Sequence, residues 1–169
     1  DIEYRYREDN RKPIPTPWDQ FNSIMQGGLG EGDFGLIFGN PGGGKSWALV
    51  ALGGMAVRLG YNVIHYTLEL GEDYVGRRYD AFFTRIPVNT ILKHTSDVET
   101  TIKDLPGNLV IKEYSPGKAS ISTLEAHIQK CIDQVKFRNF KQLAWLSIGP
   151  KLITDIYNES TDKQNICVY

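Results

Sequence analysis

This sequence of 169 residues has few cysteines and almost no net charge, and both absences exclude function classes. Its two cysteines, Cys131 and Cys167, lie far apart and match no metal-binding spacing, which favours a reducing intracellular compartment over a disulfide-bonded secreted fold. A formal charge of −1 excludes a global basic field for nucleic acid. Such a partner would have to be held by local patches or by a ring of subunits.

Long apolar runs are also absent. No stretch approaches the roughly 20 apolar residues that span a bilayer, and no signal peptide is visible. We therefore expect no membrane partner and a cytoplasmic location, which would be the host cytoplasm if the gene belongs to a phage.

What remains is the composition of one folded α/β domain, with 41% hydrophobic and 23% charged residues. The chain begins at Asp1 rather than methionine, so we expect a longer parent protein. We divide it into an N-terminal arm or linker (residues 1–12), a core (residues 13–134) and an atypical C-terminal stretch (residues 135–169).

Strand-like and helix-like segments alternate along the core. Short apolar or β-branched runs predict strands at Phe34–Phe38, Asn62–Leu68 and Asn108–Tyr114. Segments with helix start and stop signals predict helices at Trp18–Met25, Trp47–Leu59, Gly71–Arg85 and Ser120–Gln134. This alternation predicts a mostly parallel sheet with helices on both faces.

The strongest motif is a glycine-rich loop that fits G-x-x-x-x-G-K-[ST] at every fixed position. Its residues are Gly39, Asn40, Pro41, Gly42, Gly43, Gly44, Lys45 and Ser46. Glycines let several backbone N–H groups approach one phosphate chain, and the following helix adds its N-terminal dipole. We expect Lys45 to reach the β- and γ-phosphates of a nucleoside triphosphate, and the Ser46 hydroxyl to bind Mg²⁺. The expected ligands are therefore ATP and Mg²⁺.

An acidic residue, Glu69, follows the second predicted strand. Ligands of open parallel sheets bind outside the carboxyl ends of the strands, so this carboxylate is placed to polarise an attacking water as a general base. The alternative is an ordinary solvated loop glutamate. Arg77, Arg78 and Arg85, further on, either contact a nucleotide or neighbouring subunit or belong to an exposed helix face.

From Ile14 to about Gln134 the sequence resembles the RecA-like ATPase domain of DnaB-type replicative helicases, particularly those of bacteriophages. The entry I-P-T…F-N…G-G (14–28), the segment L-G-Y-N-V-I-H-Y-T-L-E-L (59–70) and the third strand with its loop (109–117) carry this resemblance. It implies a RecA-like P-loop NTPase fold, with the catalytic glutamate of the family falling on Glu69. It also implies single-stranded DNA as partner and a homo-hexameric ring.

The resemblance ends after Gln134. The family continues with an apolar strand and an aspartate, the Walker B element, whereas here Leu143–Leu146 is followed by Ser147 and Ile148. The DNA-gripping loops and the arginine finger of the family are absent from this sequence. A frameshift would explain the change, because a shifted frame across Trp145–Ile148 permits an apolar residue followed by aspartate. In that case residues 135–169 were not selected to fold; the alternative is an ordinary diverged terminus.

The sequence thus favours the motor domain of a phage-like replicative DNA helicase, with Lys45 and Glu69 as catalytic residues. A RecA-type recombinase or a RecA-like regulatory ATPase shares the same motifs. A nucleotide-binding fragment without turnover is the third possibility, since the metal-binding aspartate is missing.

Overall fold

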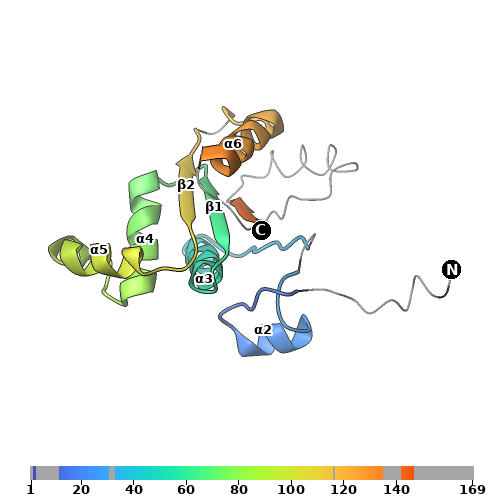
Figure 1. Ribbon diagram of the computed structural model, residues 1–169, viewed down its shortest axis with the longest axis horizontal. Coiled ribbons are helices and arrows are strands. Elements are labelled where there is room, and N and C mark those ends of the chain that lie inside the picture. Colours follow the sequence, from blue (N-terminus) through green and yellow to red (C-terminus); the bar gives the residue numbers. More distant parts are fainter. Residues whose placement is uncertain (1, 3–11, 31–32, 116, 135–141, 147–169) are drawn as a thin grey trace.

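The computed structural model describes residue 2 and residues 12–30, 33–115, 117–134 and 142–146. In chain order its elements are α2 (Asp19–Ile24), α3 (Lys45–Arg58), β1 (Asn62–Thr67), α4 (Glu72–Thr84), the 3-10 helix η1 (Ile91–Lys93), α5 (Thr95–Lys103), β2 (Leu109–Glu113), α6 (Ile121–Gln134) and β3 (Gln142–Leu146) (Figure 1). No helix among these residues is long and apolar enough to cross a membrane.

The strands form a three-stranded sheet in the order β2-β1-β3. Both neighbours run parallel to β1, and Val63 pairs with Leu109 on one side and with Leu143 on the other. Each parallel connection is made through a helix, as parallel pairing requires. The prediction of a parallel α/β sheet is confirmed.

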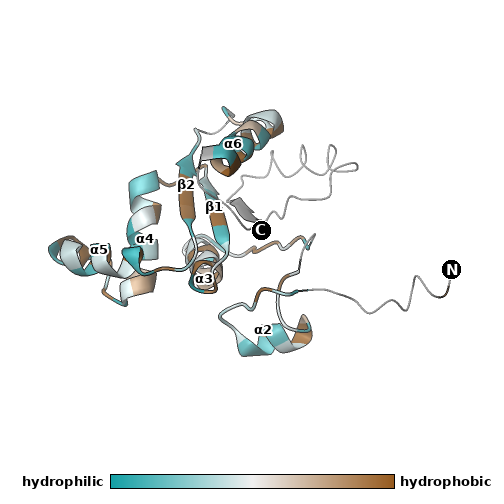
Figure 2. Ribbon diagram, viewed as in Figure 1, coloured by the Kyte–Doolittle hydropathy of each residue, from teal (hydrophilic) through white to brown (hydrophobic). Residues whose placement is uncertain are grey.

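Side chains of β1 alternate between two apolar cores, because successive residues of a strand point to opposite faces. Val63 packs with residues of α3 and α4, whereas Ile64 and Tyr66 pack with Leu124 and Cys131 of α6. Helices therefore cover both faces of the sheet, as the sequence predicts (Figure 1). Figure 2 shows hydrophobic residues concentrated on β1, β2 and α3.

The helix and strand boundaries follow local signals. Gly60, with φ +86°, ends α3, and Arg85, with φ +61°, ends α4. The Ser120 hydroxyl accepts a hydrogen bond from the backbone N–H of Thr123 at 3.2 Å, which caps α6. All four predicted helices and the strands β1 and β2 form within a few residues of their expected bounds.

The predicted strand at Phe34–Phe38 is wrong, since these residues have no regular secondary structure. Phe34, Leu36 and Phe38 are 58%, 54% and 86% exposed. An extended segment becomes a strand only when a neighbour supplies hydrogen bonds. Both edges of β1 are already occupied, by β2 and β3, and within the described residues no strand pairs with this segment.

The segment before it is tied down by side-chain hydrogen bonds. Asn22 Oδ1 accepts from the Thr16 N–H at 2.8 Å and from its hydroxyl at 2.7 Å, and Asn22 Nδ2 donates to the Thr16 carbonyl at 2.9 Å. Ile14 and Leu29 form an antiparallel bridge. At the adjacent Gly28, with φ +122°, any side chain would run into the Ile14 backbone. The family-like lead sequence thus forms one hydrogen-bonded unit.

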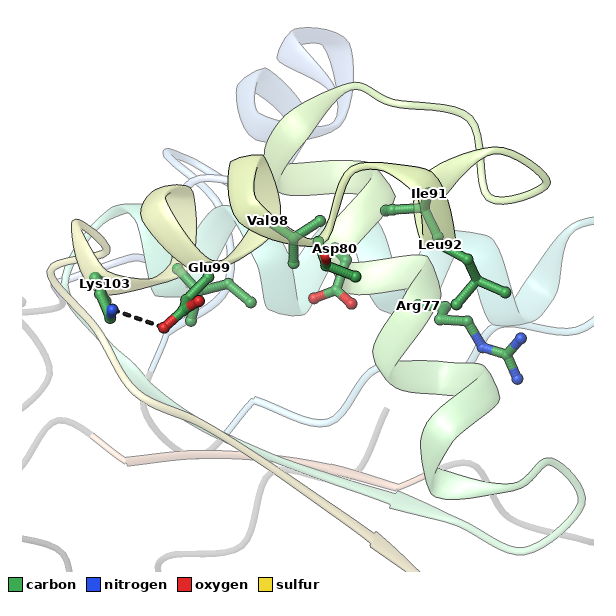
Figure 3. A pocket seen from close by; sticks show the side chains of 9 residues that line it. Arg77, Asp80, Ile91, Leu92, Val98, Glu99 and Lys103 are labelled. Atoms are coloured by element: carbon green, nitrogen blue, oxygen red, sulfur yellow. Dashed lines mark hydrogen bonds and ion pairs between the residues drawn. The ribbon is translucent and has the colours of Figure 1, made fainter.

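The elements η1 and α5, which lie between α4 and β2, were not predicted from the sequence. A shallow groove separates them from α4; Figure 3 shows Leu92 and Val98 along it, with Arg77 at one end and Lys103 at the other. Ile91 is buried here.

At the C-terminal side, the backbone of Gln142–Leu146 forms β3 beside β1. The apolar run that precedes the expected aspartate is therefore a strand. The rest of residues 135–169, including Ser147 and Ile148, lies outside the described residues, so the frameshift hypothesis stays a prediction.

Candidate functional site

The glycine-rich loop leads directly into α3, and its backbone is in conformations that favour glycine. Gly42 has φ +76° and Gly44 has φ +83°. A Cβ added at either position would meet no atom within 4 Å, so the left-handed backbone, not crowding, requires glycine there. Gly43 N–H donates to the Asn40 carbonyl at 3.0 Å and closes the turn.

This conformation leaves several backbone donors free. Among the described residues, no acceptor is present for the N–H groups of Gly42, Gly44, Lys45 and Ser46. Residues 39–44 are exposed to solvent. Successive N–H groups in alternating right- and left-handed conformations form a concave anion site, and the N-terminus of α3 adds a partial positive charge. Such an arrangement of donors can bind an anion.

The Lys45 side chain folds back over the loop. Its Nζ donates to the carbonyl oxygens of Gly39 at 2.9 Å and Asn40 at 3.0 Å. These hydrogen bonds hold the ammonium against the loop backbone, and a charged oxygen ligand would compete with the two carbonyls for it. Ser46, in the first turn of α3, is half-buried.

Glu69 lies exposed in a bend immediately after β1. The bend is closed by the buried Thr67, whose hydroxyl donates to the Leu70 carbonyl at 2.8 Å and accepts from the Leu70 N–H at 3.1 Å. This pair of bonds turns the chain outward at Glu69. The sequence located Glu69 at the carboxyl end of a strand, which is confirmed, but it gave no hint that Thr67 shapes the bend.

Contacts between α3 and α4 place the glycine-rich loop and Glu69 at the same end of the helix pair. They run in the same order along both helices: the Arg78 guanidinium covers the Trp47 ring, Tyr79 approaches Gly53, and Arg58 reaches the Phe83 carbonyl. The first turns of α3 and α4 therefore lie at one end. The loop precedes one of these turns and Glu69 precedes the other.

A buried polar pair joins β1 to α4 near this region. His65 Nδ1 and the Tyr79 hydroxyl lie 2.9 Å apart, and both residues are buried. Burial, assisted by the positive charge of Arg78, lowers the pKa of His65 to about 4. His65 is thus a neutral packing residue at pH 7, as its place in a strand suggests.

Metal ligands are few. No group of three or more His, Cys, Asp or Glu side chains that could hold a metal gathers in the described part of the chain. A divalent cation here would depend on Ser46 and on oxygens of its own ligand, since magnesium commonly keeps substrate phosphates and waters in its coordination shell.

Comparison with known proteins gives one informative similarity. No family model matches the chain. It is 27% identical over 129 residues to a protein described as a DnaB-like replicative helicase from Enterobacteria phage T4. The match covers 72% of this chain and 27% of that protein, so the chain spans about a quarter of the relative's length. The similarity supports a relationship to helicases at this coarse level.

Proposed function

We propose that this chain is the ATP-binding motor domain of a DnaB-like replicative DNA helicase. The observation that carries the proposal is the loop at Gly39–Ser46, which combines backbone amides that have no acceptor among the described residues with the Lys45 ammonium, held by two loop carbonyls at the start of α3. Glu69 at the same end of the α3–α4 pair and the similarity to the phage T4 protein support it.

Each residue would have a separate task. The loop amides and Lys45 would bind and orient the phosphates, and the dipole of α3 would add to the attraction. Ser46 would hold Mg²⁺, which supplies charge neutralisation at the phosphates when bound. Glu69 would orient the attacking water and accept its proton. In a replicative helicase of this type, this chemistry would drive movement along single-stranded DNA in a homo-hexameric ring.

A RecA-type recombinase or regulatory ATPase would use the same loop and glutamate. The helicase-like order of the Thr16–Asn22 lead, the loop and the Glu69 segment favours the helicase.

A second candidate is a nucleotide-binding chain without turnover. It is favoured by β3, which lies parallel to β1 and is followed in the sequence by Ser147 and Ile148 rather than by aspartate. Without a carboxylate there to help hold the metal, the transition state loses part of its charge stabilisation. Nucleotide binding would remain while hydrolysis falls by orders of magnitude.

Binding of a fluorescent ATP analogue with Mg²⁺ tests the shared claim. Lys45→Ala should weaken binding about 10- to 100-fold, the loss expected for a charge-assisted hydrogen bond of roughly 1.5–3 kcal/mol. The matched control is Lys103→Ala, which removes an exposed lysine paired with Glu99 at 2.7 Å on α5. Equal affinity of wild type and Lys45→Ala would refute the phosphate site.

Steady-state ATPase assays with and without single-stranded DNA separate the two candidates. DNA-stimulated turnover that Lys45→Ala and Glu69→Gln abolish supports the motor. Tight binding without turnover supports the second candidate. Light scattering adds the oligomeric state, and a monomer would contradict a working ring.

A further inference from the structure

The Arg78 side chain lies between two aromatic rings that belong to different helices. Its guanidinium carbon lies 5.1 Å from the centre of the Trp47 ring on α3 and 4.8 Å from the centre of the Tyr74 ring on α4. Both distances fall within the range of cation–π attraction. Trp47 directly follows Ser46 of the loop, and Tyr74 lies in the first turns of α4 after Glu69.

Within the described residues, Arg78 is held by these two rings and forms no ion pair. Its Nε is buried and has no hydrogen-bond partner in the described part of the chain. Arg77, its neighbour in sequence, shows the contrast: its guanidinium carbon lies 5.8 Å from the centre of the same Tyr74 ring, but Arg77 is also paired with Asp73 at 2.7 Å and lies at the edge of the α4–α5 groove (Figure 3). A half-buried guanidinium with no carboxylate partner among the described residues calls for an explanation.

The rest of the α3–α4 interface is fixed by close packing. Tyr79 and Phe82 fit against Gly53 and Gly54 in the second half of α3. At the far end, Arg58 Nη2 donates to the Phe83 carbonyl at 2.9 Å. At the end nearest the loop, Trp47 of α3 contacts Arg78 of α4.

We propose that Arg78 is a positioning residue, and that the Trp47–Arg78–Tyr74 stack couples the phosphate-binding end of α3 to the segment that carries Glu69. This inference rests on the proposed function, because the coupling matters only if the loop binds phosphates. Only Leu70 and Gly71 separate Glu69 from α4, so the first turn of α4 sets where Glu69 lies. When phosphates bind at the loop, they restrict the motion of the first turn of α3. The stack transmits this restriction to α4.

Hydrogen exchange with and without MgATP tests the coupling separately from binding. In the wild type, MgATP should slow amide exchange both in the loop (39–47) and in the segment 69–78. In Arg78→Ala, the loop should still be protected, whereas the protection of 69–78 should fall by about fivefold, the factor that corresponds to a contact of about 1 kcal/mol. Arg78→Lys, which keeps the cation, should restore part of it.

The matched control is Lys103→Ala, which removes an exposed cation on α5 that is paired with Glu99 at 2.7 Å and lies outside the stack, and it should keep both protections. If Arg78→Ala does not fold by circular dichroism, Trp47→Leu removes the other side of the stack and should uncouple the same segment. Equal protection of 69–78 in wild type and variant, or none in the wild type despite a protected loop, would overturn the inference alone. An unprotected loop in the wild type would overturn the proposed function, and the coupling with it.

Discussion

Replacing Gly53 with alanine sets helix propensity against packing in α3, the helix that follows the glycine-rich loop. Alanine is a better helix former than glycine by up to about 1 kcal/mol, so propensity alone predicts a more stable protein. At Gly53, however, the new Cβ would fall on the Tyr79 hydroxyl and lie 3.2 Å from its Cζ. Tyr79 is 1% exposed and cannot swing into solvent.

The packing cost should win. Overpacking a tight core costs roughly 1–3 kcal/mol, and displacing the hydroxyl also strains its 2.9 Å contact with His65. We therefore expect Gly53→Ala to lower the free energy of unfolding by about 1–2 kcal/mol, measured by urea denaturation with an unchanged m-value. Gly54→Ala should be destabilising as well, since its Cβ would fall on the Cδ1 and Cε1 atoms of the Phe82 ring, which Arg58 and Phe83 also contact.

The double variant Gly53→Ala/Tyr79→Phe isolates the clash. Tyr79→Phe alone loses a buried hydrogen bond worth about 1 kcal/mol, but it also removes the atom that the new methyl group meets. The two changes together should therefore cost about 1 kcal/mol less than the sum of the single changes. A stabilising Gly53→Ala, or strictly additive effects, would refute the close approach of α3 and α4.

Two further changes test the supports of the site and of the sheet. Burial and the Arg78 charge lower the pKa of His65 to about 4, so between pH 4 and 6.5 the unfolded chain binds a proton that the folded chain does not. The free energy of unfolding should therefore rise with pH across this window, by at most about 3 kcal/mol. Urea titrations of His65→Gln should show a weaker dependence of this free energy on pH. An unchanged pH dependence would contradict the lowered pKa of His65. Ser120→Ala should lower the free energy of unfolding by about 1 kcal/mol, because it removes the hydrogen bond to Thr123 that caps α6. As a control, Ser122→Ala changes an exposed serine of the same helix and should alter this free energy by less than about 0.5 kcal/mol. Equal effects of the two changes in thermal unfolding would argue against the cap.

Local signals explain which elements the sequence could predict. Gly60 and Ser120 mark helix ends through their own conformational and hydrogen-bonding preferences, and the β-branched run of β1 marks a strand. By contrast, α5 reads Thr-Ser-Asp-Val-Glu-Thr-Thr-Ile-Lys, rich in residues of modest helix propensity. In the structure, α5 packs against α4. A contact between two separate segments of the chain cannot be recognised from the local sequence of either one.

The same distinction between local and long-range signals applies to the candidate site. The loop motif and the place of Glu69 were readable because spacing alone defines them. The hydroxyl of Thr67 and the Trp47–Arg78–Tyr74 stack were not, since each depends on how a bend or two helices meet in space. Arg78 and Arg77 look alike in sequence, and only the structure shows that Arg78 lies between two rings whereas Arg77 pairs with Asp73.

The wrong strand at Phe34–Phe38 shows that the loop does not need an upstream strand to hold its shape. Its left-handed backbone comes from Gly42 and Gly44, and its closure from the Gly43–Asn40 bond and the Lys45 side chain. All of these contacts lie within the motif itself. A strand needs a partner from elsewhere in the chain, whereas this loop needs only its glycines and α3. Phosphate binding should therefore tolerate changes in 34–38 far better than changes at Gly44, because the geometry that presents the free amides is encoded locally.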